Sequence, residues 1–89
     1  MNNKPFVVGK NYLIRTVTMI YTGRLKAVYP TELVLDAACW IAETARWMQA
    51  VANSEFKEVE PYPKDADVII SRGAIIDAVQ IKVLPSEQK

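Results

Sequence analysis

The chain has 89 residues, of which 51% are hydrophobic and 24% are charged, and its net charge at pH 7 is +1. A chain of this length makes one domain with a thin core, and this composition excludes intrinsic disorder. It has no histidine and a single cysteine, Cys39, which excludes imidazole catalysis, zinc sites built from His and Cys, and an internal disulfide framework.

A net charge near zero gives no long-range field that would attract a long polyanion. The high hydrophobic content predicts that some apolar area lies between copies of the chain, so we expect a homo-oligomer. Residues 1–9 contain Pro5 and have neither a signal-type nor a membrane-length apolar run. We therefore expect a protein of the cytoplasm with no membrane partner.

Residues 11–29 predict a first pair of antiparallel strands, 11–17 and 20–29. The segment is rich in β-branched and aromatic residues, with polar residues between them. Gly23 falls inside the second strand, where a missing side chain allows a sharp bend or the close approach of another backbone. Residues 32–38, with Leu33 and Leu35 on one face, predict a third strand.

The spacing of large residues then changes and predicts an inserted helix within residues 43–55, running from Glu43 or Thr44 to Asn53. Thr44 is the predicted N-cap. One helical stripe holds Trp40, Thr44, Trp47, Met48 and Val51.

Residues 56–64 contain two prolines, and we interpret them as an extended linker that returns to the sheet. Two apolar, β-branched runs follow and meet at Arg72 and Gly73, which predicts two strands joined by an abrupt bend. Gly73 would supply the permissive backbone of that bend. Residues 84–89 are predicted to be a flexible polar tail.

Three of these stretches resemble the motifs of the Sm, LSm and Hfq proteins: Tyr-Thr-Gly-Arg-Leu at 21–25, Glu-Leu-Val-Leu-Asp-Ala-Ala at 32–38, and Ile-Ile-Ser-Arg-Gly-Ala-Ile-Ile at 69–76. The resemblance implies a mainly β (α+β) fold with a strongly bent, five-stranded antiparallel sheet or small barrel, here with one helix between strands three and four. It also implies rings in which the fourth strand of one copy pairs with the fifth strand of its neighbour.

The chain departs from that family in the loop before the third strand. The loop is Tyr-Pro-Thr-Glu at 29–32, without the uridine-contacting Asp and Asn of the family. Residues 40–46 and 72–78 are also similar to a group of small bacteriophage-encoded proteins of uncharacterised function. That second resemblance implies a role against host immunity or host regulation.

We consider six residues candidates for a nucleotide-like ligand: Trp40, Thr44, Arg46, Trp47, Arg72 and Gly73. A helix N-terminus at Thr44 and Arg46 would attract phosphate, a tryptophan would stack on a base, and Arg72 would face the centre or seam of a ring. Each also has a plain structural explanation. The tryptophans suit a core, Thr44 a simple cap, Arg46 an ion pair with Glu43 or another surface acid, and Arg72 a tie to a neighbour's carbonyls at the bend. Asp36 and Asp77 end or interrupt apolar strands, and for each of them we expect a salt bridge with Arg72 or Arg24.

No motif indicates catalysis, since Cys39 has an apolar context and no carboxylate pair stands out. We expect a protein that is not an enzyme and uses no cofactor or metal. The function that we favour is capture of a small anionic nucleotide-like ligand at subunit interfaces, as in a phage-encoded sponge for an immune signalling nucleotide. The alternatives are an RNA-binding ring of Sm type and a protein-interaction module that docks through the tryptophan-bearing helix.

Overall fold

The computed structural model describes residues 5–89 and contains six strands, one α-helix and one 3-10 helix. In chain order they are β1 (Asn11–Thr16), β2 (Ile20–Val28), β3 (Glu32–Thr44), α1 (Trp47–Asn53), β4 (Phe56–Pro61), β5 (Val68–Ser71), the 3-10 helix η1 (Arg72–Ala74) and β6 (Ile75–Gln80). The expected mainly β fold with a helix between two of the strands is confirmed, but the sheet has six strands rather than five.

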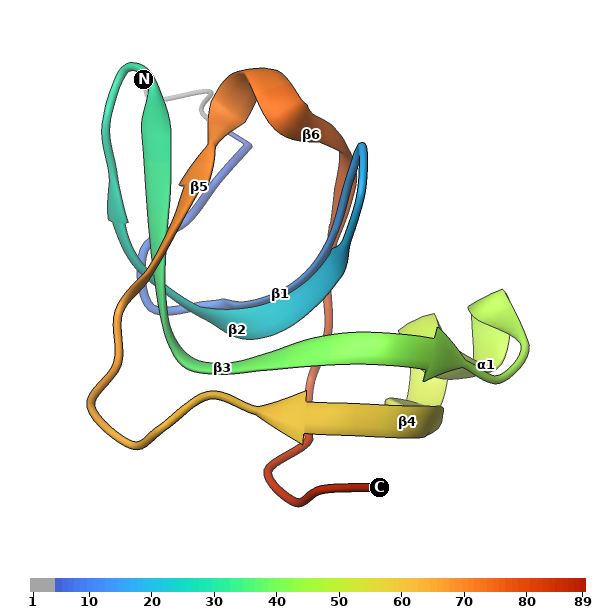
Figure 1. The fold of residues 1–89 in the computed structure, drawn as a ribbon. Coiled ribbons are helices and arrows are strands. Elements are labelled where there is room, and N and C mark those ends of the chain that lie inside the picture. Colours follow the sequence, from blue (N-terminus) through green and yellow to red (C-terminus); the bar gives the residue numbers. More distant parts are fainter. Residues whose placement is uncertain (1–4) are drawn as a thin grey trace.

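All strand pairs are antiparallel, and the sheet runs in the order β4-β3-β2-β1-β6. β5 pairs with the first part of β3 and β4 with the second part. The sheet curls strongly, so that β5 and β6 approach each other at the turn formed by η1 (Figure 1). Because no pairing joins β5 to β6 within the described residues, the sheet does not close into a barrel.

The bend of the sheet depends on the close contact of β2 with β3 at Gly23. A Cβ atom at Gly23 would lie 2.9 Å from the Cβ of Leu35 and 3.3 Å from the carbonyl oxygen of Asp36. The register of the two strands also shifts between Thr22 and Arg24. The predicted role of Gly23, to allow the close approach of another backbone, is therefore confirmed.

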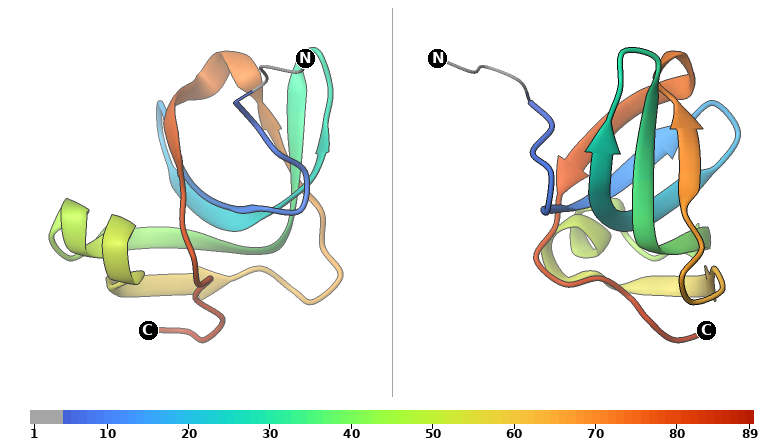
Figure 2. Two further views of the ribbon diagram at one scale, coloured as in Figure 1. Left: turned by 180° about the vertical axis from the view of Figure 1, so that it is seen from behind. Right: turned by 90° about the vertical axis from the view of Figure 1, so that its left-hand side faces the viewer.

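Two buried clusters lie on the two sides of the curled sheet. Inside the curl, one cluster includes Tyr12, Ile14, Leu25, Leu33, Leu35 and Ile70. The other lies between the outer face of the sheet and α1, and includes Leu13, Cys39, Ile41, Ala50, Phe56 and Val59. In Figure 2, α1 covers one side of the extension made by β3 and β4, which explains why this part of the sheet needs a second core.

Three predictions about the middle of the chain were wrong. β3 continues to Thr44, because residues 39–44 pair with β2 and β4 rather than turning into a helix. The helix begins only at Trp47, its N-cap position is held by Arg46 with no side-chain cap, and Thr44 is the last residue of β3. The expected linker at 56–64 contains strand β4.

The end of the chain contacts the outer edge of β4. Val59 and Lys89 exchange two backbone hydrogen bonds, with N···O distances of 3.2 and 3.0 Å. The hydroxyl of Ser54 also donates to the carbonyl of Val83. The edge of β4 is thus partly covered by Lys89, within residues 84–89 that we expected to form a flexible polar tail. In residues 5–89, no helix has both the length and the apolar character needed to cross a membrane.

Candidate functional site

The six residues predicted from the sequence do not come together in one chain. Arg72 and Gly73 belong to η1, at the top of Figure 1, whereas Trp47 begins α1 at the lower right. Trp40 and Thr44 lie in the second part of β3, which extends toward α1. A single subunit therefore carries two separate groups of candidates, one at each end of the fold.

Arg72 lies at the end of the sheet where the β2–β3 turn meets the β5–β6 turn. Its Nη1 atom donates to the carbonyl of Tyr29 at 3.0 Å, and its backbone N–H donates to the carbonyl of Thr31 at 2.9 Å. The guanidinium carbon lies 5.9 Å from the ring centroid of Phe6. Arg72 is thus tied to backbone carbonyls of its own chain, where the structural explanation named those of a neighbour, and it joins the two turns.

The same arginine lines a surface hollow of about 220 Å³. Its walls are Pro5, Phe6, Val28, Tyr29, Pro30 and Arg72. None of these residues is acidic, and Arg72 forms no ion pair with any carboxylate of residues 5–89. The hollow therefore combines an uncompensated planar cation with exposed Tyr29 and half-buried Phe6, a chemistry that suits a phosphate or carboxylate next to a flat ring.

Gly73 has no special role in the backbone of this turn. Its φ angle is not positive, so the backbone there does not require glycine. A Cβ atom at this position would meet only the Oγ of Ser71, at 3.8 Å. The expectation that the bend requires glycine was wrong, because a turn of 3-10 helix joins β5 to β6 with ordinary backbone angles.

Trp47 is already engaged by a cation of its own chain. The guanidinium carbon of Arg15 lies 4.7 Å from the centroid of the Trp47 ring. Arg15 also binds Asp77 through two hydrogen bonds, at 2.8 and 2.5 Å, and this contact lowers the pKa of the Asp77 carboxyl. Trp47 therefore helps to attach α1 to the sheet and belongs with the outer cluster.

Thr44 and Arg46 flank the turn between β3 and α1. The N-cap position of α1 is Arg46, so Thr44 lies two residues before the cap, and α1 itself has only seven residues. Thr44 and Arg46 therefore do not form the phosphate site at a helix N-terminus that the sequence suggested. Arg46 is exposed and forms no ion pair with the carboxylates of residues 5–89. The carboxylate of Glu43, one of its expected partners, lies 3.9 Å from the ammonium of Lys57 instead.

Trp40 lies on the opposite face of the sheet from α1. It is the register partner of Tyr21 on β2 and of Glu60 on β4. Its neighbours Cys39 and Ile41 are buried on the helix side, and successive strand residues point to opposite faces. Trp40 is 36% exposed, so it is not fully covered by its own chain.

A further hollow was not predicted. It has a volume of about 390 Å³ and is lined by the cations Arg24, Lys26 and Lys64, the carboxylates Asp36, Asp65 and Asp67, and by Ala37, Tyr62 and Pro63. Of the two partners expected for Asp36, Arg72 and Arg24, the structure shows Arg24, since two hydrogen bonds of 2.9 and 2.6 Å join them. A sequence signal for Arg24 and Asp36 therefore existed, but nothing in the sequence placed Lys26 next to Asp67.

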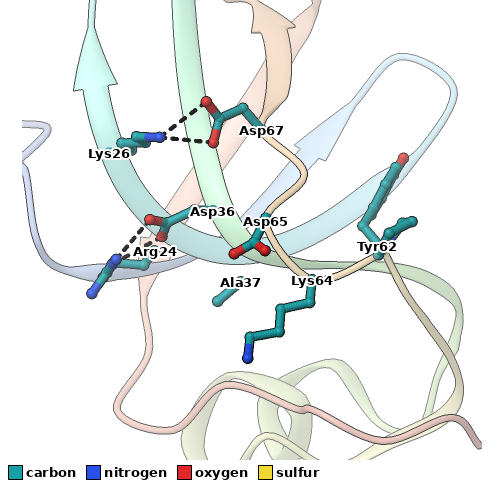
Figure 3. Close-up of a pocket in the computed structure, with 9 residues that line it drawn as sticks. Arg24, Lys26, Asp36, Ala37, Tyr62, Lys64, Asp65 and Asp67 are labelled. Atoms are coloured by element: carbon teal, nitrogen blue, oxygen red, sulfur yellow. Dashed lines mark hydrogen bonds and ion pairs between the residues drawn. The ribbon is translucent and has the colours of Figure 1, made fainter.

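Figure 3 shows the two ion pairs close together in this hollow, with the ammonium group of Lys64 pointing away from both. Lys26 binds both oxygens of Asp67 at 3.0 Å. The contact with Arg24 lowers the pKa of Asp36, and the contact with Asp67 raises the pKa of Lys26. Because the lining cations and carboxylates are equal in number, this hollow attracts an anion less strongly than the Arg72 hollow does.

Neither metal chemistry nor thiol chemistry has a developed site in the described residues. No cluster of three or more His, Cys, Asp or Glu side chains in residues 5–89 is placed to hold a metal ion. Cys39 is buried, its Sγ donates to the carbonyl of Pro85 at 3.2 Å, and burial raises the pKa of its thiol. A thiol in this state is a poor nucleophile.

No protein-family model matches the sequence, and neither a curated protein nor a solved structure matches the chain.

Proposed function

We propose that the protein is a non-catalytic, self-associating binding protein that captures a small anionic, nucleotide-like ligand at the seams between its copies. One observation carries the proposal: the guanidinium of Arg72 has no carboxylate partner in residues 5–89 and lies beside the Phe6 ring, in an open hollow that Tyr29 also lines. This hollow lies beside η1, the turn that joins two strands with unpaired edges.

The chemistry of the hollow supports a nucleotide-like ligand. The fork of an arginine matches the oxygens of a phosphate, and an exposed aromatic ring such as that of Tyr29 offers a surface for stacking a base. The hollow measures about 220 Å³, whereas ligand pockets typically enclose about 300–1,000 Å³. One copy therefore offers only part of a pocket, and a second surface is needed to enclose the rest of a nucleotide.

The unpaired edges of β5 and β6 supply a place for that second surface. β5 pairs only with β3 and β6 only with β1 among the described strands, while the edge of β4 is partly covered by Lys89. Ile69 on β5 and Ile76 on β6 are 68% and 63% exposed. An unpaired edge with exposed apolar side chains favours pairing with another chain, and here both edges flank Arg72.

Two measurements test the proposal. Sedimentation of the wild-type chain at micromolar concentration should give an oligomer, and Ile69→Lys together with Ile76→Lys should shift it toward the monomer. The wild type should gain melting temperature with nucleotides from a panel of mono-, di- and cyclic nucleotides. Arg72→Gln should lose that gain, while Arg46→Gln, at the other end of the fold, should keep it.

Three results would contradict the proposal. A well-folded monomer at these concentrations would show that the chain forms no interface at which the ligand could bind. If no nucleotide of the panel raised the melting temperature, the ligand would not be a nucleotide. Binding of single-stranded RNA whose affinity falls steeply with salt, with no response to nucleotides, would instead support an RNA-binding ring.

A further inference from the structure

We propose that a second site, on the face of the sheet opposite α1, binds a lysine or arginine side chain from an extended segment of a partner protein. The site is a hollow of about 250 Å³ lined by Met19, Trp40, Glu60, Pro61, Tyr62 and Pro63. It is separate from the Arg72 hollow and shares no residue with it.

The strand register builds the hollow. Tyr21, Trp40 and Glu60 are consecutive partners across β2, β3 and β4, so their side chains stand in one row on the face that α1 does not cover. Tyr62 follows β4 and packs on Tyr21, with 6.4 Å between ring centroids. The hydroxyl of Tyr21 in turn contacts the Sδ of Met19 at 3.1 Å. Through Tyr21, these contacts hold Tyr62 and Met19 in place at the hollow before any partner binds.

The charge of the hollow selects a cation. Glu60 is the one charged residue of the lining, and it forms no ion pair with the cations of residues 5–89. The faces of tryptophan and tyrosine attract cations, and a desolvated cation above such a ring is favoured further by a nearby carboxylate. Lysine and arginine also carry long apolar stems, which suit walls made of two prolines and a methionine.

The shape of this face indicates a side chain delivered by a partner rather than a free small molecule. Trp40 is 36% and Met19 is 40% exposed, so the hollow is open and would not enclose most of a small ligand. A second hollow, of about 290 Å³, shares Met19 and Trp40 and continues past Val17 toward Ala42. An extended chain lying across Trp40 would occupy both hollows, with its basic residue near Glu60.

The test uses the full chain and two peptides that differ in one charge: acetyl-Ser-Pro-Lys-Pro-Ser-amide and the same peptide with norleucine in place of lysine. Binding is followed by the NMR shift of the Trp40 indole N–H, which a Trp40→Phe variant assigns. We expect the lysine peptide to bind at least about fivefold more tightly than the norleucine peptide. Glu60→Gln should remove the preference, while Glu58→Gln, a neighbouring carboxylate outside the hollow, should keep it.

Four outcomes would overturn the proposal. Equal binding of both peptides would show a purely apolar hollow. An unchanged preference in Glu60→Gln would place the cation elsewhere. Tighter binding of tetramethylammonium chloride than of the lysine peptide, or no shift with either peptide at millimolar concentration, would exclude a partner side chain.

Discussion

Arg15 on β1 lies over the indole ring of Trp47 on α1, with 4.7 Å between the guanidinium carbon and the ring centroid. The same guanidinium holds Asp77 on β6, so one side chain connects the helix to two strands. This contact explains how a helix of seven residues, too short to be stable alone, keeps its place on the sheet. It also means that the Trp47 ring is already engaged by a cation of its own chain.

The first prediction concerns this contact. Arg15→Ala should lower the melting temperature, because it removes a stacked cation from Trp47 and leaves Asp77 without its partner. Arg15→Lys should recover only part of the loss, since an ammonium lacks the planar fork. Thermal unfolding followed by circular dichroism measures both, with Lys82→Ala as an exposed control. Equal melting temperatures for Arg15→Ala and the control would contradict the role of Arg15.

The second prediction concerns the bend of the sheet. Gly23→Ala should reduce the free energy of unfolding by about 1–3 kcal/mol, because the added methyl group would press on Leu35 and on the backbone of Asp36. Gly73→Ala is the matched control, since its methyl group meets only the Oγ of Ser71 at 3.8 Å. Urea denaturation of the two variants compares them directly. If both variants lost the same stability, the loss would reflect glycine replacement in general rather than the contact of β2 with β3.

The strands predicted most accurately from the sequence are those in which the local residue pattern favours the same extended conformation as the pairing in the sheet. The strands expected at 11–17 and 20–29 lie at Asn11–Thr16 and Ile20–Val28. The helix was placed too early, because its N-terminus was set at Glu43 or Thr44 from the helical spacing of Trp40, Thr44 and Trp47. Pairing of Ile41 with Ile20 and with Val59 overrides that spacing and keeps the chain extended.

The candidate site was harder to predict than the fold, because its contacts join distant parts of the chain. The pair Arg24 and Asp36 could be proposed from adjacent strands, but Asp77 was expected to bind Arg24 or Arg72 and instead binds Arg15. That pair spans 62 positions and depends on the register of β1 with β6. Neither local pattern nor composition encodes such a register.

The third prediction concerns a buried hydroxyl. Thr22 is fully buried between β1 and β3, and within the described residues its Oγ1 atom makes no hydrogen bond of good geometry, only an approach to the thiol of its register partner Cys39. Thr22→Val keeps the shape and removes the unpaired polar group, so it should raise the free energy of unfolding by up to about 1 kcal/mol. Thr22→Ala should instead lower it, because it leaves a void. Urea denaturation measures both, and a destabilised Thr22→Val would reveal a hydrogen bond that the hydroxyl makes in solution.

The fourth prediction concerns acid. Arg24 lowers the pKa of the Asp36 carboxyl and Arg15 lowers that of Asp77, chiefly through hydrogen bonds to the charged form. In the unfolded chain an aspartate titrates at about pH 3.9. The unfolded state therefore takes up protons first as the pH falls. The stability that these pairs contribute is fully present above that value and is lost as the pH falls through the lower pKa of the folded state.

The free energy of unfolding should accordingly change little between about pH 7 and 5 and fall below about pH 4. Asp36→Asn should flatten the acid decline, because one of the carboxylates that must be protonated is gone. Asp65→Asn is the matched control, since Asp65 lies in the same hollow but forms no ion pair with residues 5–89. Urea denaturation at pH 7, 5, 4 and 3 compares the three proteins. An acid decline as steep in Asp36→Asn as in the wild type would mean that carboxylates other than Asp36 control the stability of the fold at low pH.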